Sequence, residues 1–287
     1  MMKAEMMVSI PKIALRWKWP LLLWPYLVVG ALLLFGEIIP EPLVYDVPTF
    51  MQLSFLETHW TYAYLHAFAF IPVFLLSFDR KVHYYTEWKV LFPAILIMGS
   101  FFILWDAYKT LSGVWGFNTN YITAGSFLYL PWEEWMFFLT VPFASIFIYA
   151  CLNAYFPGDP LQKWDKPLTL GIIVLCFLFA LLTIEKAYSS TTFILTGGFM
   201  LYHWLYVPNT YRTRFYRAFL VILIPFLLVD GVLTGGFTQQ PVVVYNPAEF
   251  MGIRIVSVPV EDAVYGFLHL FGVCYWMEWL RKGDKAL

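Results

Sequence analysis

The sequence predicts an all-α polytopic membrane protein of about eight transmembrane helices, arranged as two parallel tandem repeats. Three observations predict this fold class: the composition, the number of long apolar runs, and the alternation of basic residues between loops. Of the 287 residues, 61% are hydrophobic and only 13% are charged, and the mean hydropathy is +0.68. Soluble domains are about half apolar and about a quarter charged. We therefore expect a multi-pass protein of the cell membrane.

Apolar runs long enough to cross a bilayer, which takes about 17–25 residues, occur eight times along the chain. The first run follows Lys12, Arg16 and Lys18 and lacks a clear small-residue cleavage site, so we expect a retained helix rather than a signal peptide. The fifth and sixth runs are separated only by IEKAYSS, which requires a tight turn. The runs fall near residues 20–38, 60–78, 90–108, 131–155, 167–184, 191–207, 217–235 and 258–280.

Basic residues alternate between loops in the way that the positive-inside rule describes. Most of the 18 Lys and Arg residues lie in the N-terminal arm, at the C-terminus, and in residues 79–89, 157–166 and 208–217. The alternate loops contain only Lys109, Lys186 and Arg254. We therefore expect the N-terminus and the C-terminus in the cytoplasm. The formal net charge is −1 and there is no basic block, so no nucleic-acid partner is expected.

The two halves of the chain contain similar segments. FFILWDAYKTLSGVWGFN precedes LPWEEWMFF in the first half, and PFLLVDGVLTGGF precedes VPVEDAVYGF in the second. In each half an apolar helix ends at an Asp, a turn with Gly follows, and Pro with two acids opens the next helix. We expect a first repeat at 1–160 and a second at 161–287, each of about four helices, together forming one membrane domain. An even number of crossings gives the two copies the same orientation.

Six acidic residues are expected at the non-cytoplasmic end of the bundle. A single acid in a first helical turn is usually only a cap, but ionisable groups at membrane depth mark functional sites by default. The paired acids are therefore candidate catalytic residues. Because a helix turns about 100° per residue, the two acids of a pair point to different places, so one can act while the other orients or binds. The six are Asp106 and Asp230 at helix ends, and Glu133, Glu134, Glu261 and Asp262 at helix starts.

The remaining motifs narrow the chemistry. There is no GxGxxG, P-loop, HExxH or Asp-rich motif, and the His and Cys residues lack metal-ligand spacing, so no cofactor and no metal are expected. Acids and aromatic residues in apolar surroundings fit proton-initiated chemistry on an apolar substrate. A carboxylic acid protonates an alkene, and aromatic faces stabilise the cation. His269, eight residues after Glu261, is a candidate for a proton relay. The candidate substrate-binding aromatics are Trp105, Trp115, Phe117, Trp132, Phe138, Tyr265 and Phe267.

These motifs resemble a known family. WD-(x)₃-T-x-x-GVW-x-FN with LPxEE, and D-x-x-x-TG with G-x-RI-(x)₃-PxED-x-x-YGF, resemble the two homologous subunits of the heterodimer-type lycopene cyclases, here with both halves fused in one chain. The resemblance covers roughly residues 55–287. It implies the four paired acids as functional groups, with Asp106, Asp230 and Arg254 in supporting roles.

The resemblance also implies a reaction. The family converts the ends of lycopene to β-ionone rings, giving γ-carotene and then β-carotene, without redox change and without a flavin. The expected activity is therefore that of a carotenoid cyclase, an isomerase (intramolecular lyase). The expected partners are lycopene, taken from the lipid phase, and other enzymes of the carotenoid pathway. We expect one composite site between the halves, opening sideways to lipid.

Three alternatives stay open. Sister cyclases form ε-rings or act on C50 carotenoids, and the motifs do not separate these activities. A small proton-coupled transporter would use the same acids to carry protons, and it predicts helices broken at mid-span. The sequence has no strongly interrupted pair at matching positions, because Pro72, Pro93, Pro142 and Pro225 are expected only to kink their helices.

Overall fold

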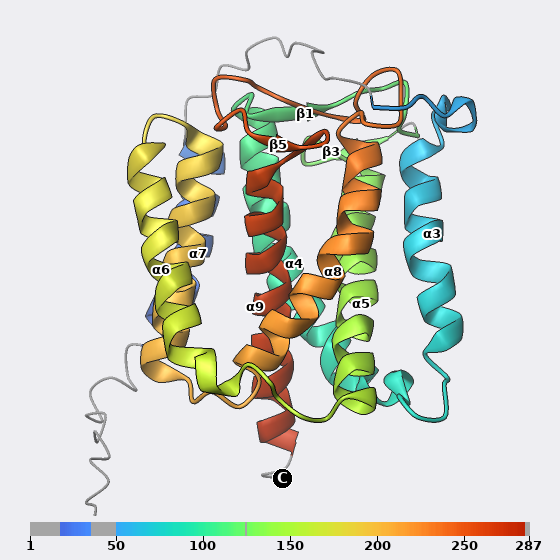
Figure 1. Ribbon diagram of the computed structural model, residues 1–287. Coiled ribbons are helices and arrows are strands. Elements are labelled where there is room, and N and C mark those ends of the chain that lie inside the picture. Colours follow the sequence, from blue (N-terminus) through green and yellow to red (C-terminus); the bar gives the residue numbers. More distant parts are fainter. Residues whose placement is uncertain (1–17, 36–49, 124, 285–287) are drawn as a thin grey trace, which may run out of the picture.

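A computed structural model of the chain describes residues 18–35, 50–123 and 125–284, and these residues are mostly helical. Eight long helices occur in these ranges, and Figure 1 shows them as a bundle with loops and short strands gathered at one end. They are α2 (Lys18–Phe35), α3 (Thr61–Leu76), α4 (Trp88–Leu111), α5 (Trp132–Tyr155), α6 (Asp165–Leu182), α7 (Ala187–Tyr206), α8 (Arg212–Leu233) and α9 (Val260–Asp284).

Each of these helices coincides, within a few residues, with one of the apolar runs in the sequence. Pro72, Pro93, Pro142 and Pro225 lie inside α3, α4, α5 and α8, which continue through them. Among the described residues, four helical stretches are long and apolar enough to cross a membrane. They are Tyr84–Leu111, Trp132–Tyr155, Gln162–Leu182 and Arg212–Leu233. The mostly helical fold with candidate membrane spans is thus confirmed, while eight crossings stay a prediction.

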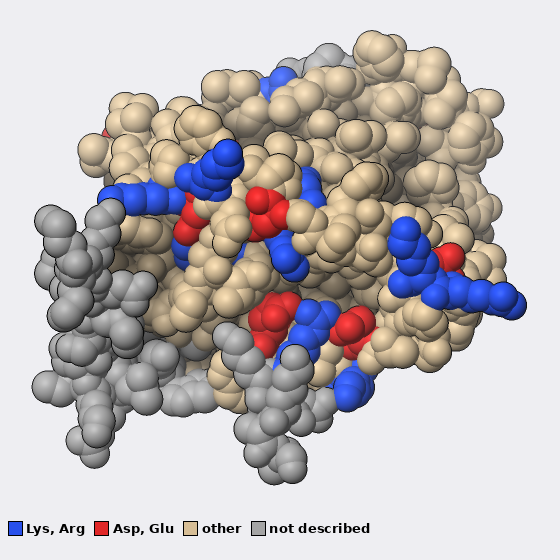
Figure 2. Space-filling model, turned by 60° about the horizontal axis from the view of Figure 1, so that its bottom comes forward, with Lys and Arg blue, Asp and Glu red and all other residues tan. Residues whose placement is uncertain are grey.

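Basic side chains gather at the end of the bundle away from the strands. Figure 2 shows this end, with Lys and Arg interspersed with acidic residues. At the strand-bearing end the described basic residues are Lys109, Lys186 and Arg254. Lys3, Lys12, Arg16 and Lys285, which also entered the loop-charge argument, lie outside the described residues, as do residues 36–38 of the first apolar run. The basic residues at the far end are Arg80, Lys81, Lys89, Lys163, Lys166, Arg212, Arg214, Arg217 and Arg281.

Two three-helix units have the same arrangement. The first consists of α3, α4 and α5, and the second of α7, α8 and α9. In each unit the first helix packs against the third, and between the units α4 packs on α9 and α5 on α8. The helix α6 returns the chain to the end at which α3 begins, so that both units run in the same direction (Figure 1). A four-residue connection, 183–186, joins α6 to α7.

Short strands, which the all-α prediction did not include, connect the units. The strand β1 pairs antiparallel with β4, with Gly116 opposite Val244. Each unit also has a small hairpin just before its last helix, β2–β3 in the first and β5–β6 in the second. All three first-unit strands lie 128 residues before their counterparts. The strands are β1 (Trp115–Phe117), β2 (Ser126–Phe127), β3 (Leu130–Pro131), β4 (Val243–Tyr245), β5 (Arg254–Ile255) and β6 (Val258–Pro259).

Glu57 forms hydrogen bonds with loops of both units at the strand-bearing end. Its Oε2 accepts a hydrogen bond from the Tyr121 hydroxyl at 2.6 Å, and its Oε1 accepts one from the backbone N–H of Gln239 at 2.7 Å. Burial, together with the hydrogen bond to Glu57, raises the pKa of Tyr121 to about 12. The hydroxyl therefore keeps its proton at neutral pH and stays a donor.

A buried ion pair joins α6 to the second unit. Arg212, at the start of α8, is only 3% exposed. Its Nε donates to Asp165 Oδ1 at 2.8 Å and its second terminal nitrogen donates to Oδ2 at 2.6 Å. This bidentate contact fixes the start of α6 against the start of α8.

Removing the charge of Asp165 should therefore destabilise the fold. We expect Asp165→Asn to lower the free energy of unfolding by about 3 kcal/mol, because it leaves a buried guanidinium without its countercharge. The measurement is the melting temperature in detergent. Glu87→Gln is the matched control, because its partner Arg281 and Glu87 itself are each 32% exposed, and exposed pairs contribute less than about 1 kcal/mol. Equal losses in the two variants would contradict this account.

Candidate functional site

Four carboxyl groups from both units meet in one buried cavity at the strand-bearing end of the bundle. Asp106 comes from α4, Glu134 from α5, Asp230 from α8 and Asp262 from α9, with exposed fractions of 4%, 6%, 7% and 5%. All four had been predicted as site residues. The cavity has a volume of about 60 Å³. We refer to it as the acid cavity, defined by these carboxyls and by Tyr62, Tyr188, Tyr245 and Tyr265.

The local sequence explains why acids begin α5 and α9. Pro131 closes the hairpin and forms the N-cap of α5, with φ −64° and ψ 157°; having no N–H, proline suits the entry to a helix. The acids that follow lie in the first turn, where backbone N–H groups are unpaired and the helix dipole favours negative charge. Because successive side chains point about 100° apart, Glu133 faces its own loop and Glu134 faces the cavity.

The first acid of each pair binds the loop that precedes its own helix. Glu133 Oε1 accepts hydrogen bonds from the backbone N–H and the hydroxyl of Thr123, at 2.7 and 2.6 Å. Glu261 Oε1 accepts one from the backbone N–H of Met251 at 2.8 Å and one from the Ser189 hydroxyl at 2.5 Å. Thr123 and Met251 are 128 residues apart, as the two acids are. Glu133 and Glu261 thus make the same contact in both units and hold the loops that close the cavity.

The second acid of each pair faces the cavity and is held by tyrosines. The Tyr62 hydroxyl donates to Glu134 Oε2 at 2.7 Å. Asp262 accepts hydrogen bonds from two hydroxyls, that of Tyr188 at Oδ1 and that of Tyr245 at Oδ2, the latter at 2.9 Å. Burial raises the pKa of Tyr245, which lies at the end of β4 at the strand-bearing end of the bundle. Its hydroxyl therefore keeps its proton and donates.

Each of these acids also hydrogen-bonds to the Asp at the helix end of its own unit. Asp106 pairs with Glu134, and Asp230 pairs with Asp262. A hydrogen bond between two carboxyl groups requires a proton on one of them, since two carboxylates repel each other. Each bonded pair therefore contains at least one carboxylic acid, and where the second group is a carboxylate, a proton donor lies beside a proton acceptor.

The two pairs differ in one contact. The Tyr265 hydroxyl donates to Asp106 Oδ1 at 2.6 Å. The residue 128 positions before Tyr265 is Phe137, which lines the cavity but has no hydroxyl. Asp230 Oδ2 is buried, and no hydroxyl or N–H of a described residue donates to it. Asp230 is thus the least restrained of the four carboxyls.

Of the seven aromatic residues predicted to bind substrate, Trp115, Phe117 and Tyr265 line the acid cavity. Trp105 lies behind them and contacts Tyr265, with 5.3 Å between the ring centroids. These side chains come from α4, β1 and α9. The structure therefore brings three of the seven to the cavity and a fourth into contact with its lining.

The other predicted residues lie away from the cavity. Trp132 points outward and is 53% exposed, whereas Phe138 and Phe267 are buried in the core of the bundle. Neighbours on one helix point to different sides, so closeness to an acid along the chain does not bring a ring to the cavity. Arg254 is the exception, because it lies beside the cavity residue Tyr245: its guanidinium is 5.7 Å from the ring centroid of Tyr245 and 4.8 Å from that of Phe250.

Several cavity residues were absent from the sequence-based set. They are Tyr62, Tyr188 and Tyr245, which bind the acids, and Phe137 on the wall. Tyr62 and Tyr188 begin the first helices of the two units, and this recurrence is the signal that could have identified them. Tyr245 and Phe137 are the counterparts of Phe117 and Tyr265, which were predicted, so the repeat could have identified them too.

His269, the candidate for a proton relay, also lines the acid cavity. Its ring packs against those of Phe102 and Phe138, with centroid distances of 4.6 and 5.4 Å. Its Nε2 is buried and makes no hydrogen bond to any described residue. The position suits a relay at the deeper end of the cavity.

The arrangement offers two acid–base pairs next to apolar and aromatic walls. It can give a proton to an apolar substrate and accept one back. Within the described ranges, no group of three or more His, Cys, Asp or Glu side chains is placed to hold a metal ion.

Comparison with known proteins identifies the family. A family model described as lycopene cyclase matches residues 59–152 and 185–280, more than half of the chain. The chain belongs to the lycopene cyclase family. The two matched regions of this cyclase nearly coincide with the two three-helix units and contain all four acids of the cavity; α2 and α6 lie outside them. Family membership supports a carotenoid cyclase activity. No curated protein and no solved structure matches the chain.

The loop contacts of Glu133 and Glu261 can be tested without substrate. We expect Glu133→Ala to speed amide hydrogen exchange in residues 118–131, and Glu261→Ala to speed it in residues 246–259, because each removes the acceptor of a loop N–H. Mass spectrometry of the detergent-solubilised chain measures this exchange. Glu185→Ala, at an exposed carboxylate of the connection before α7, should change neither loop. Unchanged exchange in both test variants would show that these acids do not hold the loops.

Proposed function

We propose that the chain is a lycopene β-cyclase in which the two subunits of a heterodimer-type cyclase are fused. The observation that carries the proposal is the single cavity lined by acids of both units, which explains why both halves are needed. The family match supports it. Both ends of lycopene become β-ionone rings, giving γ-carotene and then β-carotene. The atoms of the substrate are only rearranged, so the reaction is an isomerisation that needs no cofactor.

Each ring forms in three steps. A carboxylic acid adds its proton to the terminal double bond and leaves a tertiary carbocation. The nearby internal double bond attacks this cation, and the new carbon–carbon bond closes a six-membered ring with the charge on a ring carbon. A carboxylate then removes a ring proton, and the electrons of that C–H bond form the ring double bond. The cavity loses one proton and regains one.

We assign the proton donor to Asp230. No hydroxyl or N–H of a described residue donates to its buried Oδ2, so Asp262 is the group that holds its proton. Asp262 is itself held by two tyrosines, and in the reaction the Asp230 proton leaves this hydrogen bond and goes to the substrate. The charge left after proton transfer is shared with Asp262 and its tyrosines.

The second pair, Asp106 with Glu134, is assigned the return of the ring proton. Its hydrogen bonds from Tyr265 and Tyr62 stabilise a carboxylate ready to accept a proton. The ring of Trp115 on the cavity wall stabilises the carbocation between the two steps.

A sister activity would use the same first two steps. Formation of an ε-ring differs only in which ring carbon loses its proton, and hence in where the accepting carboxylate lies. Cyclisation of a C50 carotenoid differs in the substituent on the reacting end. We favour lycopene as the substrate because the matching family model is described as lycopene cyclase, and β-rings as the product that the resemblance to the heterodimer-type cyclases implies.

We propose eight membrane crossings in the cell membrane, with both termini in the cytoplasm. Four helical stretches have the length and apolarity of spans, and the other long helices stand beside them (Figure 1). Basic residues gather at the end away from the acid cavity (Figure 2), so the positive-inside rule puts the cavity near the non-cytoplasmic face. Repeats at 1–160 and 161–287 then contain one unit each, preceded by α2 or α6.

Lycopene enters from the lipid, and other carotenoid-pathway enzymes are candidate partners.

Expression in a lycopene-producing host, followed by chromatography of the carotenoids, tests the proposal. Asp230→Asn keeps the shape of the side chain but cannot donate the proton, so we expect ring formation to fall by about 100-fold or more. Glu134→Gln, Asp262→Asn and Asp106→Asn should also reduce it strongly. Glu133→Gln and Glu261→Gln retain an acceptor oxygen for their loops and should reduce it much less.

A matched pair of variants separates Asp230 from Asp106. Phe137→Tyr adds a hydroxyl where it can bond Asp230, as Tyr265 bonds Asp106, and should slow ring formation by occupying the donor. Tyr265→Phe removes the existing hydroxyl and should have the smaller effect. Wild-type activity in Asp230→Asn would refute the donor assignment. Wild-type activity in all four cavity variants would refute the proposed function itself.

A further inference from the structure

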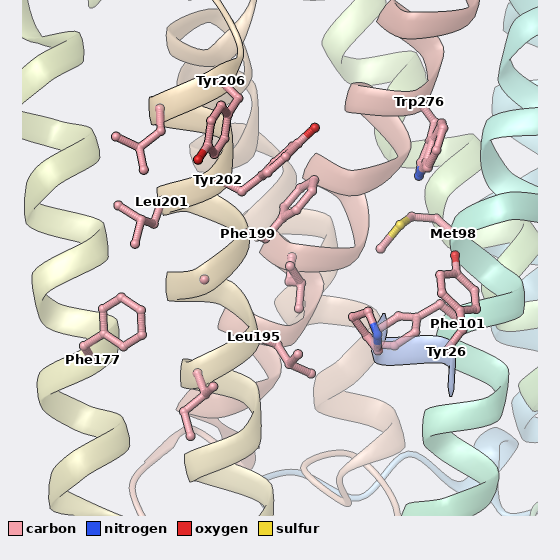
Figure 3. Close-up of a pocket in the computed structure, with 15 residues that line it drawn as sticks. Tyr26, Met98, Phe101, Phe177, Leu195, Phe199, Leu201, Tyr202, Tyr206 and Trp276 are labelled. Carbon is pink, nitrogen blue, oxygen red and sulfur yellow. The ribbon is translucent and has the colours of Figure 1, made fainter. Parts of the chain in front are cut away.

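A second cavity opens in the side of the bundle, apart from the acid cavity. It has a volume of about 370 Å³ and is lined by side chains of α2, α4, α6, α7 and α9. Figure 3 shows Leu195 and Phe199 of α7 facing Met98, Phe101 and Tyr26 across the space. We refer to it as the side crevice, defined by these five residues and Trp276. Its lining is apolar and largely aromatic.

We propose that the side crevice binds the half of the carotenoid that is not being cyclised; this inference rests on the proposed function. Lycopene has two identical ends, and the acids of both units form one cavity, so the ends must react in turn. While one end occupies the acid cavity, the rest of the molecule extends away from it. The volume of the side crevice lies in the range of small-molecule sites, about 300–1,000 Å³.

The two cavities lie along the same helices at a suitable distance. On α7, Tyr188 lines the acid cavity and Tyr206 lines the side crevice, and the 18 residues between them span about 27 Å. On α9, Tyr265 and Trp276 line the two cavities and lie on nearly the same side, because eleven residues make about three turns. An extended C40 polyene is about as long as the hydrocarbon core is thick, about 30 Å. A carotenoid held at the acid cavity is therefore long enough to reach the side crevice.

Aromatic rings connect the two cavities. Phe101 lines the side crevice and contacts Trp105, with 5.8 Å between ring centroids. Trp105 in turn contacts Tyr265 of the acid cavity at 5.3 Å. Flat rings pack well against a flat polyene. Trp105 does not line the acid cavity, but it lies between the two cavities, where its ring can pack against the bound carotenoid.

The helix α2 supplies one wall of the side crevice. Pro25 and Tyr26 line it, and the Tyr26 hydroxyl donates to the carbonyl of Ile97 on α4 at 2.8 Å. Because α2 lies outside both regions matched by the family, this wall is an addition to the repeated units. It separates part of the crevice from the surrounding lipid.

The crevice should control how many rings form. In the first round it receives an acyclic end, and in the second it receives the end that already carries a ring, which is bulkier. Narrowing the crevice should therefore hinder the second round more than the first, so that the monocyclic product accumulates.

Gly198 provides the test. It lines the side crevice, and a Cβ added there meets no atom within 4 Å. Gly198→Phe should therefore fill the crevice without displacing the backbone. In a lycopene-producing host we expect the ratio of monocyclic to bicyclic product to rise about tenfold or more, the discrimination that a hydrophobic pocket shows for small differences in size. Gly198→Ala adds only a methyl group and should raise the ratio much less than Gly198→Phe does. Gly171→Phe, on α6 in equally open surroundings outside the crevice, controls for an added ring on the outside of the bundle.

An unchanged ratio in Gly198→Phe, in a chain with the helix content and melting temperature of the parent, would overturn the inference. Loss of both products in this variant, with Gly198→Ala active, would support it, since a blocked crevice then excludes lycopene. Leu195→Trp fills the same space from the preceding turn and serves if Gly198→Phe does not fold. Failure of the proposed function would appear differently, as ring formation that survives substitution of the acid-cavity carboxyls.

Discussion

Four carboxyl groups buried together in one small cavity are the constraint on which the rest of this structure depends. Burying a carboxyl group is costly unless hydrogen bonds or a proton compensate for the lost water. Here tyrosine hydroxyls bind three of the four groups, and each carboxyl shares a hydrogen bond with a second carboxyl. Such contacts require four helix ends to be held in place. The β1–β4 pair, the two hairpins and the loop contacts of Glu133 and Glu261 hold them.

The repeated units explain both the cavity and its asymmetry. One unit supplies an Asp at a helix end and two acids at a helix start, and the second unit supplies the same set 124 to 128 residues later. At two positions the units differ by a hydroxyl, with Phe117 against Tyr245 and Phe137 against Tyr265. The first substitution leaves Glu134 with one tyrosine where Asp262 has two, and the second leaves Asp230 with none. A nearly symmetric frame thus contains four carboxyls in unequal surroundings, as a donor and an acceptor of protons require.

The sequence predicted much of this because the relevant signals are local. Long apolar runs predicted the eight helices, and the repeated motifs predicted six acids at one end of the bundle, of which Asp106, Glu134, Asp230 and Asp262 share the cavity. The phase of each helix about its axis was not predictable. Glu133 and Glu134 are adjacent, and only packing with the other helices determines which one faces the cavity. Tyr62 and Tyr188 come from helices distant in the chain, so their contacts with the acids depend on the tertiary fold. The side crevice could not be predicted either, because it is formed by five helices without a shared motif.

The central claim is that a proton from a cavity acid begins ring closure, and the origin of one ring hydrogen tests it most directly. The purified chain would be incubated with lycopene in D₂O without added nucleotide, and the products analysed by mass spectrometry. The cavity acid exchanges with solvent before it donates, so each ring formed should contain one deuterium. Cyclic product formed in D₂O without deuterium would contradict the claim.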